Sequence, residues 1–496
     1  MALACLLLAA AFVAAAEPVL LVRPYLQPGP KPMVGPTDDM RLIWLTEPTE
    51  ATFTVEYGPV GGPTATAKIE RTEFSFPSAT NRIGLKLESA QRYTRFVAAL
   101  DGLPTNEEYV YAVKCGDKVL ARKTSKARVT PDRPTRFVMV GDLADGKSAQ
   151  NTIAYAIHGE KPDFLVALGD IVYPSGRSHH YFKHYWPTYV NAETADAETG
   201  APLMTTMPFY AVLGNHDTAV GKLTPTLPDA WAAYYFFTAP QNGPGEGPWS
   251  TEVPKSAQGA EFRRQAGSSY PALGFYSFDY GSAHITVIDN SGNGKTDDPK
   301  AVEWLRKDLA STKQPWKFVC LHMPPFQINA EHYAAQRQRR LAPLFEAQGV
   351  DVVFSGHVHN YQRSKPLRFA PSAVQPAVKP EPAAKNTDPA LPPRTPPSYV
   401  NGVFTFDEQY DGVTKTRPKG VIYVVEGGGG AGLYKGTIEK LLAKLPNGGR
   451  DNYAPFNAKY HDKRHSYAII DLTPRRFELR AIDEDGEEID RFAIEK

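Results

Sequence analysis

Up to residue 134 the chain alternates apolar and polar residues in short runs. In one of these runs Phe53, Val55 and Tyr57 share one face, with polar residues between them. A period of two is typical of a half-buried β-strand. Similar runs follow with turn residues between them, and none has a helical period. The pattern predicts a small β-sandwich over residues 17–134.

After residue 134 the apolar runs become nearly continuous and alternate with helical patterns. Such strands are typical of parallel sheets that are covered on both faces, and strand–helix alternation predicts an α/β unit. One helix is marked by Asp298, which can cap it, and by Leu305 and Leu309 on its apolar face. We therefore expect an α/β domain over residues 135–496. Its strands are expected at Phe137–Val140, Phe164–Leu168, Phe209–Leu213, Ile285–Ile288, Phe318–Leu321 and Val350–Phe354.

The first sixteen residues are mostly small and apolar, and the last three of them are Ala14, Ala15 and Ala16, which precede the charged Glu17. An apolar run followed by small residues is typical of a signal peptide. We expect residues 1–16 to be removed and the protein to be secreted or periplasmic. The run is shorter than the ~20 residues of a membrane span, and no other stretch approaches that length, so we expect no membrane span.

A proline-rich segment interrupts the α/β pattern. Between residues 366 and 398 prolines recur among Ala, Lys, Glu and Thr with almost no large apolar residue. Such a segment cannot bury enough apolar surface to offset the entropy lost on ordering it. We therefore predict a disordered insertion at 366–398 within the α/β domain.

The overall composition is that of an ordinary globular protein, with 42% hydrophobic and 22% charged residues. The formal net charge is +1, which does not favour nucleic acid or an anionic membrane as the main partner. Cys115 and Cys320 remain after the predicted leader, and they fall in the two different predicted domains. We therefore expect no disulfide framework. The sequence does not indicate the oligomeric state.

Five of the predicted strands are each followed at once by side chains that can bind a metal ion or a proton. In chain order these are Asp142, Asp170, Asn215 with His216, His322, and His357 with His359, and Tyr173 follows Asp170 by three residues. Each has an ordinary explanation when taken alone, since Gly-Asp pairs form turns, Asn caps helices and histidines occur in cores. Taken together, these ordinary explanations would all have to apply by coincidence at the carboxyl edge of one sheet, which is where α/β proteins bind ligands. The pattern predicts a metal site.

The number of donors favours two metal ions over one. A single ion takes about four to six donors, and a carboxylate can bridge two ions. The candidates number seven: Asp142, Asp170, Tyr173, Asn215, His322, His357 and His359. Paired ions stabilise both the attacking and the leaving oxygen of an in-line displacement. The sequence therefore predicts hydrolysis of a small-molecule phosphoester.

The motifs at these strand ends, in this order and spacing, resemble the calcineurin-like metallophosphoesterases, and Tyr173 makes them resemble the purple acid phosphatases in particular. Leu103-Pro104 followed by Tyr109 and Tyr111 is similar to the tyrosine corner of a fibronectin type III domain, which also belongs to that family pattern. The resemblance implies a fibronectin type III-like β-sandwich followed by an α/β metallophosphoesterase domain with two metal ions. One would be ferric iron, held by Asp142, Asp170, Tyr173 and His359. The other would be a divalent ion, zinc, manganese or iron, held by Asn215, His322 and His357, with Asp170 as the bridge.

The resemblance and the donors together imply an exported phosphatase that hydrolyses phosphomonoesters at acid to neutral pH by in-line attack of metal-bound hydroxide. We expect His216, oriented by Asp217, to stabilise the transition state or to protonate the leaving group, and His332 to face the substrate. Two alternatives remain open. One is a secreted phosphodiesterase, nucleotide-cleaving or alkaline, on the same scaffold, and the less favoured one is a non-catalytic surface-binding protein.

The sequence departs from the family pattern at three places. Asp145 lies in a longer loop after Asp142, where it is expected to crowd or tune the first metal ion. Gln362 stands where the family usually has Glu, which removes a charge near the site. The proline-rich insertion follows almost at once and is expected to alter the rim of the pocket.

Overall fold

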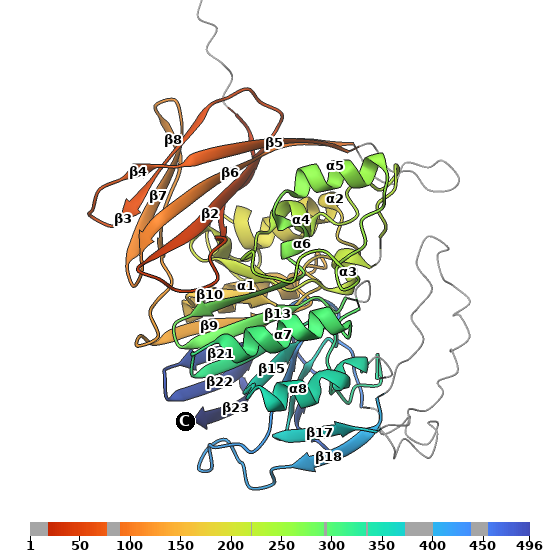
Figure 1. The fold of residues 1–496 in the computed structure, drawn as a ribbon. Coiled ribbons are helices and arrows are strands. Elements are labelled where there is room, and N and C mark those ends of the chain that lie inside the picture. The colour runs from red at the N-terminus through yellow and green to blue at the C-terminus, as the bar shows by residue number, and fades with distance from the viewer. Residues whose placement is uncertain are drawn as a thin grey trace, which may run out of the picture.

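The computed structural model describes residues 18–76, 90–219, 221–291, 295–333, 336–372, 400–437 and 455–496. Its amino-terminal part consists of two four-stranded antiparallel sheets, in the orders β1-β2-β6-β5 and β4-β3-β7-β8 (Figure 1). Trp44 lies in their common core, with its ring 5.2 Å from that of Phe96. The predicted β-sandwich is confirmed. Its strands are β1 (Leu20–Pro28), β2 (Thr37–Thr46), β3 (Phe53–Pro59), β4 (Ala65–Thr66), β5 (Lys68–Phe76), β6 (Gln91–Pro104), β7 (Glu108–Cys115) and β8 (Lys118–Lys126).

The second part of the chain is built on two larger sheets, in the orders β11-β10-β9-β21-β22-β23 and β12-β13-β14-β15-β19-β16-β20. The sheets share one core, in which the rings of Phe137 and Phe318 lie 6.2 Å apart. The strands of the first sheet are β9 (Thr135–Val140), β10 (Phe164–Ala167), β11 (Phe209–Ala211), β21 (Ser466–Leu472), β22 (Arg476–Asp483) and β23 (Glu488–Glu495). Those of the second are β12 (Phe275–Tyr280), β13 (Ala283–Ile288), β14 (Trp316–Leu321), β15 (Val352–Ser355), β16 (Tyr361–Ser364), β19 (Ile422–Glu426) and β20 (Asn457–His461).

All six of the predicted α/β strands are present, but they do not belong to one sheet. Strands β9, β10 and β11 run parallel in the first sheet, and β13, β14 and β15 run parallel in the second. The expectation of a single sheet edge for the metal donors was therefore wrong. Apolar runs indicate which segments are buried, but they do not indicate which sheet a segment joins. Because the two sheets share a core, the carboxyl ends of both sets of strands meet at one rim, where the His357 backbone N–H reaches Asp142.

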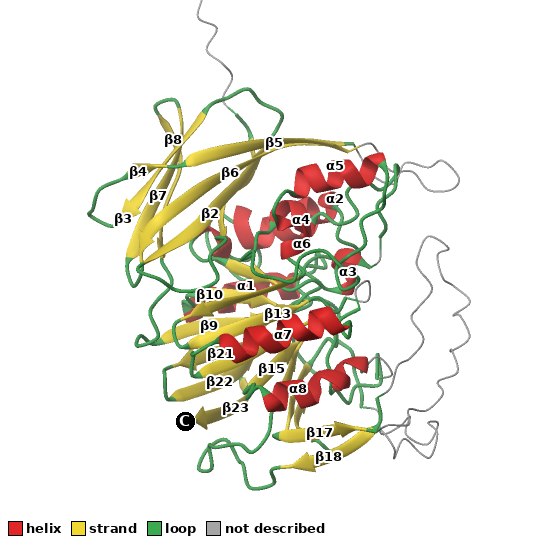
Figure 2. Cartoon of the chain, viewed as in Figure 1, coloured by secondary structure: helices red, strands yellow, loops and turns green. Residues whose placement is uncertain are grey.

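Helices α1 and α7 pack against strands of the two larger sheets, whereas α4 and α5 lie beside the amino-terminal sandwich (Figure 2). On α7, Asp298 caps the amino terminus by accepting a hydrogen bond from the Lys300 backbone N–H, and Leu305 and Leu309 are buried, as predicted. The α-helices are α1 (Ser148–Glu160), α2 (Ser178–His180), α3 (Asn215–Thr218), α4 (Ala233–Phe236), α5 (Ala257–Ala266), α6 (Ser269–Ala272), α7 (Pro299–Ser311) and α8 (Ala342–Ala347). Short π or 3-10 helices are η1 (Tyr181–Tyr185), η2 (Pro187–Asn191), η3 (Leu203–Thr205) and η4 (Arg337–Leu341). Within the ranges that the structure describes, no helix is both long and apolar enough to cross a membrane.

The sequence analysis placed the start of the proline-rich insertion too early. Residues 367–371 form β17 (Leu367–Pro371), which pairs with β18 (Gly402–Phe406). This strand forms because Leu367 and Phe369 alternate with exposed residues and are buried in the second core of the domain. Residues 373–398 of the proposed insertion and the predicted signal peptide at 1–16 lie outside the described residues.

Candidate metal centre

Several of the predicted donors adopt a backbone conformation that is unusual for a residue with a side chain. Asp142, Asp170 and His357 have φ angles of +60°, +50° and +68°, and His332 has +57°. A left-handed φ is uncommon outside glycine, and such strain concentrates at functional sites. Asp142, Asp170 and His357 follow three different strands and His332 lies in the loop after β14, so no single turn explains them. The backbone at this rim is therefore shaped to aim particular side chains.

One group of donors gathers around His322 at the end of β14. Its Nε2 lies 3.3 Å from Asp170 Oδ2 and 3.1 Å from Asn215 Oδ1. His322 Nδ1 donates a hydrogen bond to the Leu168 carbonyl oxygen over 2.9 Å, which leaves Nε2 to face the other donors. Asp170, His322 and His357 each offer a donor atom, and these atoms lie within 4.8 Å of one another. All three residues are buried.

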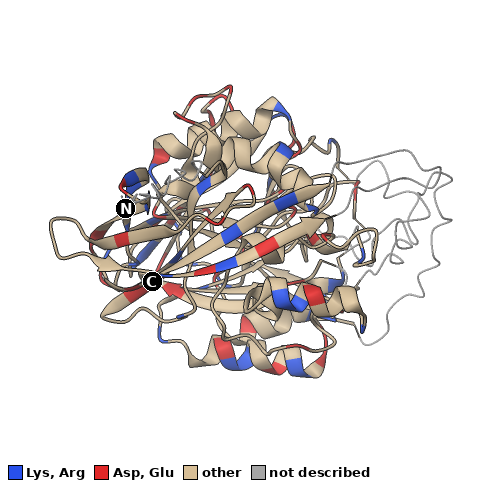
Figure 3. Ribbon diagram, turned by 90° about the horizontal axis from the view of Figure 1, so that it is seen from above, with Lys and Arg blue, Asp and Glu red and all other residues tan. Residues whose placement is uncertain are grey.

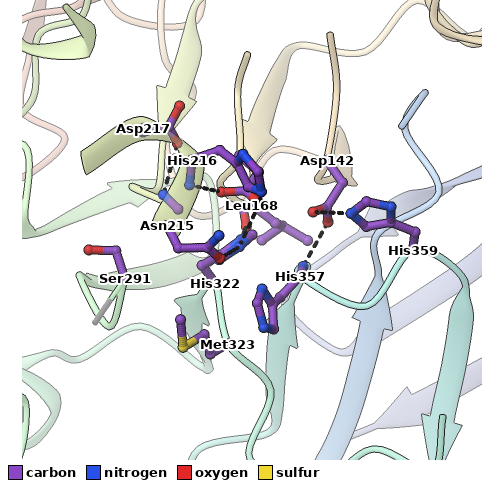
Figure 4. A network of polar contacts seen from close by, with 12 residues as sticks. Asp142, Leu168, Asn215, His216, Asp217, Ser291, His322, Met323, His357 and His359 are labelled. Carbon is purple, nitrogen blue, oxygen red and sulfur yellow. Dashed lines mark hydrogen bonds and ion pairs between the residues drawn. The ribbon is translucent and has the colours of Figure 1, made fainter. Parts of the chain in front are cut away.

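A second group gathers around the hydroxyl of Tyr173. This oxygen lies 2.8 Å from Asp142 Oδ1, 3.0 Å from His359 Nε2 and 3.1 Å from Asp170 Oδ2. Asp142 Oδ1 is also 3.2 Å from His359 Nε2. Figure 4 shows the two groups side by side, with His322 and Asn215 in one and Asp142 and His359 in the other. Asp170 contributes to both groups.

Two glycines allow the main chain to come close to the carboxylates. A Cβ at position 214 would lie 2.2 Å from Asp170 Oδ1, and a Cβ at position 427 would lie 2.7 Å from Asp142 Oδ2. Real Cβ atoms do not approach so closely, so Gly214 and Gly427 are required for this packing. Gly427 belongs to the run of glycines after β19, which therefore forms the wall behind Asp142.

The ionisable side chains of this site shift the pKa values of one another. Burial alone would raise the pKa of Asp170, but His322 and His216 lower that pKa far below its ordinary value. Burial lowers the pKa of His322, but Asp170 and Asp142 outweigh burial and raise it to about 9. Burial, Asp142 and Asp170 raise the pKa of Tyr173 well above its usual value. Two carboxylates thus create a field that favours positive charge at this point.

The donor set fits two metal cations. Asp142 and Asp170 are almost completely buried, and a buried carboxylate is costly unless a cation or hydrogen bonds offset its charge. Imidazole, carboxylate, amide and phenolate are ligands of iron and zinc, and one carboxylate can serve two ions. The negative charge of Asp170 and Asp142, which raises the pKa of His322, would equally stabilise a metal ion.

Residues 135–361 match the family model for calcineurin-like phosphoesterases, and this segment holds every residue of the two donor groups. The chain carries a calcineurin-like phosphoesterase domain. Curated relatives of the chain include purple acid phosphatases 18 and 15 from Arabidopsis thaliana. The first is 23% identical over 337 residues, covering 66% of this chain and 63% of the relative. The second is 26% identical over 283 residues, covering 51% of this chain and 47% of the relative.

A solved structure with a similar fold is the purple acid phosphatase PPD1 from yellow lupin seeds. Its TM-score is 0.61 at 19% identity, and the match covers 95% of this chain and 74% of the lupin chain. The match therefore includes the amino-terminal sandwich as well as the phosphoesterase domain. The structure of PhoD matches with a TM-score of 0.50 at 14% identity, over 94% of this chain and 91% of that chain. These similarities concern the fold.

His216 lies beside both donor groups of the phosphoesterase domain, but Asp217 does not orient it. His216 Nδ1 donates a hydrogen bond to the Pro174 carbonyl oxygen over 2.7 Å, and its Nε2 lies 4.0 Å from Asp170 Oδ2. The Asp217 carboxylate instead accepts hydrogen bonds from the backbone N–H groups of Gly214 and Ile171. Adjacent residues in a short helix point in different directions, which explains why this expectation was wrong.

The loop residue His332 also reaches the rim of the phosphoesterase site. Its ring centroid lies 4.2 Å from that of His357. Asp145, which was expected to crowd or tune the first metal ion, forms an ion pair with Lys147 and accepts a hydrogen bond from the Lys147 backbone N–H. Its carboxylate thus stabilises the loop after Asp142.

Gln362 links two loops of the phosphoesterase domain. Its side-chain oxygen accepts a hydrogen bond from the Ile328 backbone N–H over 2.8 Å, and its side-chain nitrogen donates to Asn360 Oδ1 over 2.9 Å. Both contacts are buried. The amide uses its acceptor on one loop and its donor on the other, so the uncharged side chain has a structural role at this position.

Tyr434 is a site residue that the sequence analysis missed. Its ring lies parallel to that of His359, with a centroid distance of 4.0 Å and an interplanar angle of 9°. The same loop supplies the Gly432 carbonyl oxygen, to which His359 Nδ1 donates over 2.7 Å. The only sequence signal was the run of glycines shortly before Tyr434, which indicates a close approach of the backbone but does not single out an aromatic residue.

Proposed function

We propose that this protein is an exported binuclear-metal phosphatase that hydrolyses phosphomonoesters at acid to neutral pH. The observation that carries the proposal is the position of Asp170 Oδ2, which lies 3.3 Å from His322 Nε2 and 3.1 Å from the Tyr173 hydroxyl. One oxygen is therefore within reach of donors from both groups, as a bridging ligand must be. The purple acid phosphatases among the relatives support the same chemistry.

The two donor groups suit different ions. We assign ferric iron to Asp142, Asp170, Tyr173 and His359, and a divalent ion, zinc, manganese or iron, to Asn215, His322 and His357, with Asp170 shared. When bound, such ions supply positive charge that activates a water molecule and stabilises the phosphate oxygens during in-line displacement.

Two histidines would act on the substrate, one by proton transfer to the leaving group and one by contact with the phosphate. In His216, Nδ1 carries the hydrogen donated to the Pro174 carbonyl oxygen, so Nε2 is the nitrogen that can exchange a proton with the leaving group. His332, whose ring neighbours that of His357, would contact the substrate phosphate from the rim. Both side chains hold their positions through contacts with the protein, which reduces the entropy lost on binding substrate.

Export is part of the proposal because of the leader-like residues 1–16. The location would be the outside of the cell or a periplasm. Amino-terminal sequencing of the protein recovered from its native compartment tests this point. A mature chain that starts at Glu17 supports export, and a cytoplasmic chain that retains residues 1–16 contradicts it.

The metal and activity assignments are tested with Asp170→Ala and Asn215→Ala. We expect both variants to lose hydrolysis of an aryl phosphomonoester, and elemental analysis to show less bound metal than in the unaltered protein. Asp411→Asn, in an exposed turn, is the matched control and should keep both properties. Substantial turnover by either site variant would contradict the assignment, as would metal-free but active protein.

Monoester and diester substrates separate the proposal from its alternatives. An aryl phosphomonoester should be hydrolysed faster than the matching bis-aryl phosphodiester, with an optimum on the acid side of neutrality. Faster diester turnover, or an alkaline optimum, would favour the phosphodiesterase. Bound metal without turnover of either ester would favour the non-catalytic binding protein.

A further inference from the structure

The outer edge of the amino-terminal sandwich is formed by β8. This strand pairs with β7 from Lys118 opposite Cys115 to Lys126 opposite Glu108. Among the described residues no strand pairs with its other side. An edge strand of this kind presents backbone N–H and C=O groups that can pair with another extended chain.

A groove runs along this free edge. Its volume is about 710 Å³, within the range of ligand-binding clefts in proteins. One wall is the continuous stretch 118–123 of β8, and the facing wall includes residues 190–193 of the phosphoesterase domain. The facing wall is anchored, since the Asn191 side chain accepts a hydrogen bond from the Arg23 backbone N–H over 3.1 Å and donates one to the Leu21 carbonyl oxygen over 2.9 Å. The groove is therefore formed before any partner binds.

The lining of the groove is strongly basic. Its cationic side chains are Arg23, Lys118, Arg122 and Lys123, and its acidic side chain is Glu193. Arg23 pairs with Glu193 at 3.4 Å, whereas neither Arg122 nor Lys123 forms an ion pair within the described ranges. The net charge of the whole chain is only +1, so this local excess does not follow from the composition. Figure 3 shows Lys and Arg positions intermixed with Asp and Glu positions over the strands and helices seen from above, as the small net charge requires.

Lysines on an edge strand often have a simpler role, which is to prevent unwanted pairing between sheets. That role requires no groove and no facing wall. Positive charge repels a basic strand, and it attracts an acidic strand. Arg122 and Lys123 are consecutive, so their side chains point to opposite faces of the strand. A chain lying along β8 would therefore meet a cation above and a cation below.

We propose that this groove docks an extended acidic peptide segment of a partner protein, which adds to the sheet as a strand beside β8. Main-chain hydrogen bonds to the free edge would supply affinity, and Arg122 and Lys123 would select consecutive Asp or Glu residues. Val119, whose exposed fraction is 45%, offers an apolar contact between Lys118 and Arg122 along the strand. This inference is independent of the proposed phosphatase activity, because the groove contains none of the metal donors.

The probe for the test is a fluorescent peptide of about ten residues, long enough to span the edge at about 3.4 Å per residue, in which Glu pairs alternate with Val and Thr. We expect saturable binding to the full-length protein at physiological salt. Arg122→Glu with Lys123→Glu should weaken binding by about tenfold or more, since two attractions become repulsions. Lys300→Glu with Lys313→Glu makes the same charge change on and after α7 and should leave binding unchanged. Absence of saturable binding, or equal loss in the control, would overturn the proposal.

Two further measurements separate strand addition from simple charge attraction. The same peptide with alternate backbone nitrogens methylated keeps its charges but loses hydrogen-bond donors, and we expect it not to bind. Amides within 118–123 should exchange hydrogen more slowly in the presence of the unmodified peptide. Undiminished binding of the methylated peptide, unchanged exchange, or tighter binding of inorganic polyphosphate than of the peptide would each overturn the proposal. Circular dichroism and urea unfolding check that the charge variants are folded.

Discussion

Gln362 accepts a hydrogen bond from the backbone N–H of Ile328 over 2.8 Å. The contact joins β16, which follows His357 and His359, to the loop that carries His332. The other end of the Gln362 amide donates to Asn360 Oδ1 over 2.9 Å. Donor and acceptor are thus both used in a buried position, which makes the amide sensitive to replacement by a carboxylate.

We expect Gln362→Glu to destabilise the protein. A carboxylate can still accept from Ile328, but its second oxygen would face Asn360 Oδ1 with no hydrogen between them. The cost of an unsatisfied buried acceptor is about 1 to 3 kcal/mol, measured as the free energy of unfolding in urea. Gln409→Glu, at an exposed position, is the control and should have little effect. Equal stability of the two variants would contradict the structural role of Gln362.

Tyr173→Phe tests the assignment of ferric iron. The hydroxyl lies 2.8 Å from Asp142 Oδ1 and 3.0 Å from His359 Nε2, so its loss removes the phenolate from this donor group. We expect the unaltered protein to absorb visible light through a tyrosinate–iron transition and the variant to lose that band. Tyr434→Phe keeps the ring stacked on His359 and should keep the band. A colourless unaltered protein that retains two divalent ions would instead indicate a relative without ferric iron.

His284 should make stability depend on pH in the alkaline range. Its Nδ1 lies 2.7 Å from Asp279 Oδ1 and its Nε2 lies 3.1 Å from Asp308 Oδ2. Burial lowers the pKa of His284, but these two carboxylates outweigh burial and raise it to about 9. Because this pKa is above that of the unfolded chain, the stabilisation is complete below about pH 6.5 and is lost as pH rises through about 9. The contribution of His284 to the free energy of unfolding below about pH 6.5 is on the order of 3 kcal/mol.

Urea unfolding between pH 6 and pH 10 measures this effect. His284→Gln should flatten the alkaline decline of the unfolding free energy. His158→Gln, on the exposed side of α1, is the control and should leave the decline intact. A decline of the same size in both variants would show that other groups cause it.

Arg339 should not tolerate replacement by lysine. Its guanidinium is completely buried, lies 5.1 Å from the Phe326 ring and 5.6 Å from the Phe404 ring, and donates to the Pro325 carbonyl oxygen over 3.0 Å. Lysine keeps the charge but lacks the planar fork that makes these contacts together. We expect Arg339→Lys to lower the unfolding free energy by roughly 2 kcal/mol. Arg340→Lys, at the exposed neighbouring position, should change the unfolding free energy little. A larger loss of stability in Arg340→Lys than in Arg339→Lys would contradict this account.

Local sequence patterns determined a large part of this protein. The period-two runs around Phe53 and Val55 predicted the sandwich, and Asp298 with Leu305 predicted α7, because alternation and capping depend on residues a few positions apart. The polar residues that end successive strands predicted the donor groups for a similar reason. The end of a strand is a local feature of the sequence, and in an α/β fold the carboxyl ends of parallel strands are where ligands bind.

The tertiary structure decided how these pieces meet. It placed Asp142 and Asp170 on one sheet and His322 and His357 on another, since no local pattern records which strands become neighbours. It turned Asp217 toward the backbone N–H of Ile171 and left His216 to the Pro174 carbonyl oxygen. Contacts of this kind join residues that are tens to hundreds of positions apart, and they depend on how two sheets pack around a common core. The sequence therefore specified the donors, and the packing of the sheets brought them together.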